Sequence, residues 1–279
     1  GLLENRATFN EESLKLLFDR MLRGAGVDVL FHSYLSGVRT EGSKVRSITV
    51  VNKSGTLELE ADYFLDTTGD ADLAALAGCA FHLGREEDSL CQPMTLCFRI
   101  GNIDMEKFHR VKSTINALYQ KHQSEGRIQN PREDVLTFPH VSEGVVHFNS
   151  TRIIKRNPLD CCDLSTAEMD AREQVYELYQ FLKNHIDGFQ NSTLLMSAPQ
   201  IGVRESRMIE GEYTITADDI LHCAKFEDSI ACGNYMIDIH SPDGAGTIRR
   251  SIPKDDYYTI PYRALIPKGM DNLLAAGRC

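Results

Sequence analysis

The sequence has no tryptophan, no run of basic residues and no apolar run near the ~20 residues that a membrane-spanning helix needs. A protein that binds nucleic acid needs a basic face, and the formal net charge of this chain is −10. None of its eight cysteines forms a Cys-x-x-Cys pair, and its nine histidines form no His-x-x-x-His or mixed Cys/His cluster. We therefore expect no nucleic-acid partner, no membrane span, no metal site and no iron–sulfur cluster.

The remaining composition is that of an ordinary soluble protein. The 279 residues are 42% hydrophobic and 25% charged, which suits one large domain or two modest ones. A chain of this length needs no disulfide staples, so most cysteines are interpreted as buried thiols in a reducing compartment. No signal peptide is recognisable at the start, and we expect a cytoplasmic protein.

One stretch, residues 61–78, combines a short strand, a tight turn and a helix. Tyr63, Phe64 and Leu65 are β-formers in a row, as expected for a strand that is covered on both faces. Thr67-Thr68-Gly69-Asp70 forms the turn, because glycine adopts conformations closed to other residues and Thr68 or Asp70 can cap the next helix. In open α/β sheets, ligands bind at such carboxyl ends of strands. A plain strand–turn–helix corner fits the local sequence equally well.

The first third of the chain reads as a helix followed by a meander. Asn10 is a natural helix cap, and the helix ends at Gly24-Ala-Gly26. This Gly-x-Gly follows a helix instead of a strand, so we interpret it as a helix end and not as a dinucleotide fingerprint. A strand is predicted over 27–31. Three antiparallel strands are predicted over 34–39, 45–51 and 56–60.

The middle and the last third alternate long helices with strands. Helices are predicted over 104–124 and from Ser165 to His185, the second with Ser165 and Glu168 as a capping box. A short helix is predicted to start at 216. Strands are predicted over 94–100, 135–138, 145–154, 194–196, 201–209, 235–239 and 257–260. A buried strand over 272–278 ends in Gly277-Arg278.

Three motifs together resemble a known family. They are Leu65-Asp-Thr-Thr-Gly-Asp70, Leu273-Leu-Ala-Ala-Gly-Arg278, and residues 198–213 taken with Tyr257-Tyr-Thr-Ile-Pro-Tyr-Arg263. The set resembles the FAD-dependent oxidoreductases of the glutathione-reductase-like superfamily. Within them it is most similar to a bacterial group like the flavin subunit of heterodisulfide reductase, some of whose members carry a "xanthan lyase" label.

The resemblance implies a fold and a division into domains. The fold class is α/β: an incomplete FAD/NAD(P)-binding Rossmann-like domain with an inserted α+β substrate domain built on a mostly antiparallel sheet. Residues 1–88 and 258–279 would belong to the FAD-binding domain, and residues 89–257 would form the substrate domain. The implied function is flavin-mediated redox of a small, possibly anionic substrate, with an electron partner that the sequence does not identify.

The resemblance also implies residue roles. Thr67, Thr68, Gly69 and Asp70 would lie against the dinucleotide, and the backbone of Leu35 would meet the adenine. Gly277 and Arg278 would lie beside the ribityl chain and pyrophosphate, although Gly-Asp is the more common pair there. Tyr262 and Arg263 would face the flavin from the substrate side.

One departure from the family pattern bears on cofactor affinity. The family opens with a strand, a Gly-x-Gly-x-x-Gly turn and a helix whose amides cradle the pyrophosphate, and this sequence has no such unit. We therefore expect this chain to bind FAD weakly or not at all and to be inactive alone, whereas the full-length enzyme should bind it.

Three polar side chains are candidates for substrate chemistry. Arg204 and Arg207 could anchor an anion, because a guanidinium binds a carboxylate in a bidentate fashion. A solvated strand of paired charges explains them equally well. His240 could donate a proton, because its ordinary pKa lies near neutrality, but a structural histidine is the favoured interpretation. Cys91 and Cys97 are likewise favoured as inert thiols.

Two other classes of function remain open from the sequence. A carbohydrate-active polysaccharide lyase would need Arg, His and Tyr to converge on an acidic sugar, and Arg204, His240 and Tyr262 could serve. A non-catalytic binding domain is the second alternative, and the many charged and aromatic residues over 198–263 argue mildly against it.

Overall fold

The computed structural model describes residues 9–279, which divide into two compact units. Unit 1 comprises residues 9–29, 93–203 and 243–245, and unit 2 comprises residues 30–92, 204–242 and 246–279. No helix within residues 9–279 is both long enough and apolar enough to cross a bilayer.

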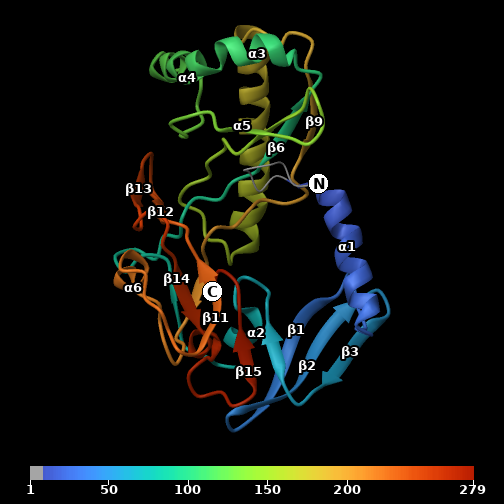
Figure 1. Cartoon of the computed structure of the whole chain (residues 1–279). Helices are drawn as coiled ribbons and strands as arrows, with labels where there is room; N and C mark the ends of the chain where they lie inside the picture. Colours follow the sequence, from blue (N-terminus) through green and yellow to red (C-terminus); the bar gives the residue numbers. More distant parts are fainter. Residues whose placement is uncertain (1–8) are drawn as a thin grey trace. The chain divides into compact units, whose positions relative to one another are not determined.

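Unit 1 is a four-stranded antiparallel sheet with helices. The sheet has the order β7-β8-β6-β9. Its strands are β6 (Phe98–Gly101), β7 (Thr137–Pro139), β8 (Val146–Phe148) and β9 (Thr193–Ser197). The helices are α1 (Glu11–Gly24), α3 (Met105–Val111), a short 3₁₀ turn η1 (Lys112–Thr114), α4 (Ile115–Ser124) and the long α5 (Cys161–His185), drawn in olive in Figure 1.

The core of unit 1 forms between this sheet and its helices. Alternate residues of β6 and β8 point into it, and the rings of Phe98 and Phe148 stack with their centroids 4.8 Å apart. Leu178 and Leu182 of α5 are fully buried in the same cluster. Because side chains alternate along a strand, Arg99, between two core residues of β6, lies on the opposite face of the sheet.

Unit 2 contains small sheets and short helices. An antiparallel meander joins β1 (Tyr34–Glu41), β2 (Lys44–Asn52) and β3 (Gly55–Glu60). The remaining strands pair in twos: β4 (Phe64–Asp66) with β15 (Leu273–Ala275), β5 (Phe81–Leu83) with β10 (Arg207–Ile209), β11 (Ser229–Gly233) with β14 (Tyr258–Pro261), and β12 (Ile237–His240) with β13 (Thr247–Arg250). The short helices are α2 (Asp72–Leu76), α6 (Ala217–Leu221) and the 3₁₀ turn η2 (Tyr262–Leu265).

A small buried cluster holds the meander of unit 2 to the β4–β15 pair. It contains Val45, Phe64, Leu73 and Leu273 among its buried residues. Asn272 ties the same elements together, because its side-chain amide donates to the carbonyls of Val45 at 2.8 Å and Asp62 at 2.9 Å. A buried amide that is bonded in this way fixes the start of β15 against the meander.

Several predicted elements are confirmed. Asn10 accepts a bond from the amide of Ser13 at the start of α1, and the meander has the predicted antiparallel pairing. Thr216 caps α6 in a full capping box. The chain mixes helices and sheets, and among the described residues every strand pair except β4–β15 is antiparallel.

The strand predicted over 27–31 is wrong. These residues form no strand, and Phe31 is 69% exposed. A strand needs a hydrogen-bonded neighbour, and within residues 9–279 none pairs with this segment. The predicted cover over both faces of β4 is also wrong here, since Tyr63 and Leu65 are exposed.

The start of the long helix also differs from the prediction. Asp160, not Ser165, caps α5, because its carboxylate accepts the amides of Cys162 at 2.9 Å and Asp163 at 2.8 Å. Ser165 lies inside the helix and donates to the carbonyl of Cys161. The strand predicted over 201–209 is likewise reduced to β10, and the helix predicted over 104–124 is interrupted by η1.

Candidate functional site

Two glycine turns of unit 2 lie next to each other, although some two hundred residues of sequence separate them. Strands β4 and β15 pair in parallel, with Leu273 opposite Phe64 and Ala275 opposite Asp66. The amide of Ala276 donates to the carbonyl of Asp66 at 2.9 Å, which carries the pairing one residue past β15. Both strands therefore end at one edge, and their turns meet there.

The backbone conformation of both turns favours glycine. Gly69 has φ of 84° and Gly277 has φ of 128°, a range that other residues rarely adopt. A Cβ atom added to Gly277 would lie 3.6 Å from the Cα of Gly69. A Cβ added to Gly69 would lie 2.8 Å from Nη2 of Arg278, closer than real Cβ atoms come. The predicted residues Gly69, Gly277 and Arg278 thus form one contiguous surface.

Asp66 shapes the first turn from inside. Its side chain is buried, and Oδ1 accepts bonds from the amide of Thr68 at 3.0 Å and from the Thr68 hydroxyl at 2.7 Å. Oδ2 accepts from the amide of Ala74 at 2.9 Å. Thr68 Oγ1 in turn accepts from the amide of Asp72, the first residue of α2, at 3.0 Å, although the N-cap position itself is Ala71. The turn that carries Thr67 is therefore fixed by one buried carboxylate.

Asp70 connects the two turns and the segment before β10. Its Oδ1 accepts from Arg278 Nη2 and from the Ser206 hydroxyl, both at 2.6 Å. Arg207 donates to the Asp70 carbonyl and to Asp72 Oδ1, both at 2.8 Å. Arg207 is thus already bonded to the Asp72 carboxylate and to the Asp70 backbone carbonyl, and its predicted role as a substrate anchor would require it to exchange partners.

A cavity of about 440 Å³ opens beside the second turn. Residues from β15 to Cys279 form one side of it. Most of its remaining wall is apolar or aromatic. The lining residues outside the turn include Met208, Ile209, Tyr213, Ile215, Ile230 and Leu265. An apolar wall beside a glycine backbone and a guanidinium can hold a flat ring with a polar edge.

The thiols near these elements are poor nucleophiles. Burial, helped by the charge of Asp66, raises the pKa of Cys279, which lines the cavity. Burial and then the carboxylate of Glu205 raise the pKa of Cys91 to about 11. Both thiols are protonated at neutral pH, and a protonated thiol reacts slowly. Among residues 9–279, no group of three or more His, Cys, Asp or Glu side chains could hold a metal ion.

The remaining predicted residues lie elsewhere in unit 2. Leu35 packs against the small buried cluster through β1. His240 is buried; its amide donates to Gln92 Oε1 at 3.0 Å, and its Nδ1 lies 2.9 Å from the Thr247 hydroxyl. Its Nε2 lies 3.7 Å from Asp238 Oδ2, so both ring nitrogens face polar side chains of β12 and β13. Arg204 stands directly before Glu205, whose carboxylate accepts the Gln92 amide at 2.8 Å.

Tyr262 and Arg263 belong to η2, whose last residues line the cavity. Arg263 pairs with Asp228 at 2.6 Å and stacks over the ring of Tyr213, 4.8 Å from its centroid. Tyr262 is 44% exposed, and its amide donates to the Asp228 carbonyl. The two residues therefore flank the cavity and do not join the glycine turns.

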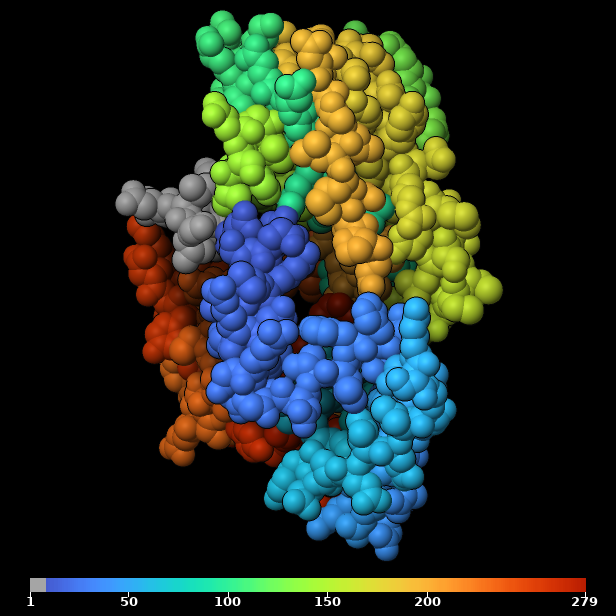
Figure 2. Space-filling view, turned by 90° about the vertical axis from the view of Figure 1, so that its right-hand side faces the viewer, coloured from blue at the N-terminus to red at the C-terminus, as the bar shows by residue number. Residues whose placement is uncertain are grey.

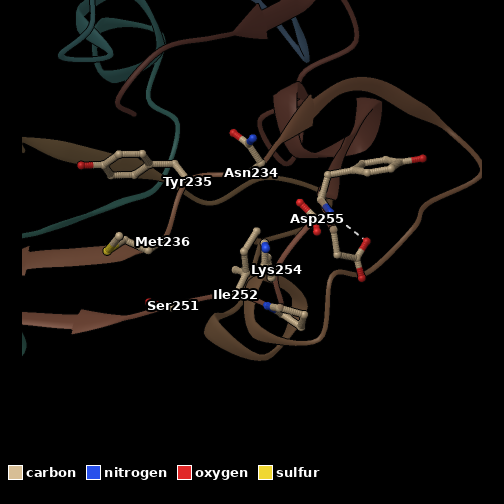
Figure 3. Close-up of a pocket in the computed structure, with 10 residues that line it drawn as sticks. Asn234, Tyr235, Met236, Ser251, Ile252, Lys254 and Asp255 are labelled. Carbon is tan, nitrogen blue, oxygen red and sulfur yellow. Dashed lines mark hydrogen bonds between the residues drawn. The ribbon is translucent and has the colours of Figure 1, made fainter. Parts of the chain in front are cut away.

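A second cavity of unit 2, of about 590 Å³, contains none of the predicted residues (Figure 3). It lies between residues 234–236 and 251–257, and Tyr235, Met236 and Lys254 are among its lining. Its walls are the connections from β11 to β12 and from β13 to β14, and neither Gly69 nor Gly277 lines it. Its size alone assigns no chemistry to it.

Sequence reasoning missed Asp66 and the cavity wall. Asp66 could have been found, because a carboxylate at the end of an apolar strand and two residues before Thr68 has the spacing of a side chain that accepts the turn amides. Nothing in the sequence indicates that Tyr213, Ile215 and Ile230, from separate segments, share one wall.

Comparison with known proteins gives a family for the whole chain. The model of the family described as FAD dependent oxidoreductase matches residues 2–279. No curated protein matches the sequence.

The solved structures that the chain matches are distant and longer. The p-nitrophenol 4-monooxygenase PnpA from Pseudomonas putida DLL-E4 is 10% identical with a TM-score of 0.44, over 74% of this chain and 45% of that one. The flavin-dependent brominase Bmp2 is 13% identical with a TM-score of 0.41, over 72% and 45%. A geranylgeranyl bacteriochlorophyll reductase-like protein from Thermoplasma acidophilum is 14% identical with a TM-score of 0.41, over 72% and 45%. The chain thus spans under half the length of these structures.

Proposed function

Because the chain belongs to the family of FAD-dependent oxidoreductases, we propose that it takes part in flavin-mediated redox of a small molecule and that its paired glycine turns contact the FAD. When bound, FAD supplies the hydride or electron transfer, and the protein supplies binding, orientation and charge. The proposal includes the finer family assignment, to the glutathione-reductase-like superfamily and its heterodisulfide-reductase-like group.

The observation that carries the proposal is the contact between Gly69 and Gly277. Both turns lack a Cβ atom on the surface where they meet, so a ligand can approach the backbone closely. Arg278 stands beside them and could face a phosphate by turning from Asp70, its present partner, and the adjoining cavity of about 440 Å³ can take a flat ring. Thr67, Thr68, Gly69, Asp70, Gly277 and Arg278 are the residues that would hold the cofactor.

The roles of other residues follow the same proposal. Arg263 and Tyr262 would act from the cavity side, with Arg263 held by Asp228. Leu35 would meet the adenine.

Arg204, Arg207 and His240 remain candidates for anchoring an anionic substrate or moving a proton, and Arg207 must first leave Asp72. Residues 1–88 with 258–279 would form the FAD-binding domain and residues 89–257 the substrate domain. Family membership does not favour the polysaccharide-lyase alternative.

The test is an NMR titration of the ¹⁵N-labelled chain with FAD. We expect weak binding, with a dissociation constant of roughly millimolar order, that shifts the amides of residues 66–70 and 275–279. Gly277→Val should abolish these shifts, because its side chain would fill the surface between the turns. Arg250→Ala, which removes an exposed arginine of β13, is the matched control and should bind like the wild type.

Two results would contradict the proposal. One is a titration in which the two turns stay unshifted while other amides respond. The other is a folded Gly277→Val variant that binds FAD as the wild type does.

A further inference from the structure

One row of side chains crosses the whole sheet of unit 1 on the face away from the core. Strand register places Phe138 of β7 opposite His147 of β8, His147 opposite Arg99 of β6, and Arg99 opposite Met196 of β9. Directly opposed residues in antiparallel strands share a face and lie in contact range. The row therefore has two nitrogen-bearing side chains at its centre and an apolar side chain at each end.

The nitrogens of this row, with those of His140 just after β7, include hydrogen-bonding atoms that are buried but not bonded. Within the described part of the chain, Arg99 Nε, His140 Nε2 and His147 Nδ1 have no hydrogen-bond partner. His140 Nδ1 accepts the amide of Ser142 at 3.0 Å, so the neutral ring carries its proton on Nε2. A buried donor without a partner destabilises the folded state. Unmatched donors that converge in one place indicate a site for an acceptor.

A carboxylate of the chain already lies at this place. Glu11, in the first turn of α1, pairs with Arg99 Nη1 through one oxygen. Its other oxygen is 3.9 Å from His140 Nε2, too far for a hydrogen bond. Glu11 therefore satisfies one donor of the cluster and leaves Arg99 Nε and His140 Nε2 unmatched.

The charges of the cluster suit an exchange of one carboxylate for another. The hydrogen bond from Arg99 lowers the pKa of Glu11 to about 2, so Glu11 is ionised at neutral pH. Burial, followed by the charge of Arg99, lowers the pKa of both His140 and His147, so both imidazoles are neutral. A ligand carboxylate that replaced Glu11 would leave the net charge of the site unchanged and could bond the remaining donors.

We propose that Arg99, His140 and His147 form a binding site for a small carboxylate that carries an apolar or aromatic group, and that Glu11 occupies this site when it is empty. Phe138 and Met196, which are 44% and 42% exposed, offer the apolar part a surface on either side of the nitrogens. Glu11 can leave, because its side chain is 32% exposed and α1 lies at the surface (blue in Figure 2). The site is independent of FAD binding and holds whether or not the glycine turns bind the cofactor.

The test uses benzoate and the ¹⁵N-labelled chain, with the imidazole resonances of His140 and His147 as the signal. Benzoate should shift both resonances saturably. Glu11→Gln should lower the dissociation constant about tenfold, as expected when an internal competitor that fills the site about nine-tenths of the time is removed. Glu12→Gln is the matched control: it removes a neighbouring acid of the same helix turn, which pairs with Lys15, and should bind like the wild type.

Two further comparisons decide whether charge is recognised. Benzamide has nearly the same shape as benzoate but no charge, and it should bind at least about tenfold more weakly, because hydrogen bonds to a charged group are stronger than those to a neutral one. Arg99→Gln should abolish benzoate binding. If that variant does not fold, His140→Phe, which removes one donor and keeps a ring at the position, should weaken binding several-fold while Ser142 and β7 stay ordered.

The proposal is overturned by equal binding of benzamide and benzoate, by equal affinity in the wild type and Glu11→Gln, or by the absence of saturable shifts in Glu11→Gln. Benzoate binding that shifts resonances outside the sheet of unit 1 and leaves both imidazoles unchanged overturns it as well.

Discussion

Asp66 is the residue on which the first glycine turn depends most directly. Three bonds from the turn and from α2 end on its buried carboxylate. Replacing it by Asn removes the charge and puts a donor where one acceptor oxygen stood. We expect Asp66→Asn to lower the free energy of unfolding by about 1–3 kcal/mol, measured from urea midpoints.

The control for that variant is Asp62→Asn, which changes an exposed carboxylate in the same segment. It should leave the midpoint within about 0.5 kcal/mol of the wild type. Equal midpoints for the two variants would show that the bonds of Asp66 do not stabilise the turn.

The Glu11–Arg99 pair predicts a pH dependence. The pKa of Glu11 in the folded chain, about 2, lies below its ordinary 4.5, so the folded state favours the ionised form. The stability that Glu11 contributes is therefore fully present above pH 4.5 and is lost as the pH falls towards 2. The difference in unfolding free energy between wild type and Glu11→Gln should shrink over that interval. A difference that stays constant from pH 6 to 2.5 would contradict the pairing.

At the residue scale, the sequence predicted what a residue type determines by itself. The left-handed conformations of Gly69 and Gly277 follow from the lack of a Cβ atom. The hydrogen bonds of the Asp70 carboxylate could not be predicted from the sequence, because its partners Ser206 and Arg278 stand far away in sequence. Arg207 showed the same limit: its charge was evident, but its pairing with Asp72 depends on the fold.

The start of α5 gives a prediction at the scale of the element. Asp160→Ala should lower the unfolding free energy by about 1 kcal/mol, the usual cost of losing a helix cap. Ser165→Ala should be within about 0.5 kcal/mol of the wild type, because Ser165 lies inside the helix and alanine favours helix. Thermal unfolding followed by circular dichroism compares the two, and the opposite order would restore Ser165 as the cap.

Element types were easier to predict than element boundaries. The periodicity of α5 was evident from the sequence, but both Asp160 and Ser165 are good caps, and the choice depends on which amides the carboxylate reaches. The prediction of a strand over 27–31 was wrong for a different reason. Its β-forming residues describe a preference, and a strand exists only where another strand pairs with it.

At the scale of the whole molecule, the core of unit 1 is continuous in sequence. Every buried residue of that cluster lies between Met94 and Ile201. Residues 93–203 expressed alone should therefore fold, with helical circular dichroism from α5 and a cooperative urea transition. Loss of Glu11 and Gly244, which contact Arg99 and Arg152, should lower its stability but not its cooperativity. A broad, non-cooperative transition would show that the core needs the rest of the chain.

The general architecture was predicted only as far as sequence-local patterns allow. The mixture of helices and antiparallel sheet followed from periodicity, and the family from three motifs. The cavity beside Gly277 could not be predicted from either, because its wall combines Met208, Ile230 and Leu265 from three separate segments. Which segments share a wall is decided by long-range packing.

The parallel pairing of β4 with β15 has a consequence for how the protein is made. The ribosome synthesises β4 early, and its partner appears only after all of unit 1 has been translated. Residues 93–203 can reach their folded state during synthesis, whereas unit 2 must wait with Leu65 and its neighbours unpaired. Closing so long a loop is slow. During synthesis β4 therefore remains without its partner strand until β15 has been translated and has paired with it.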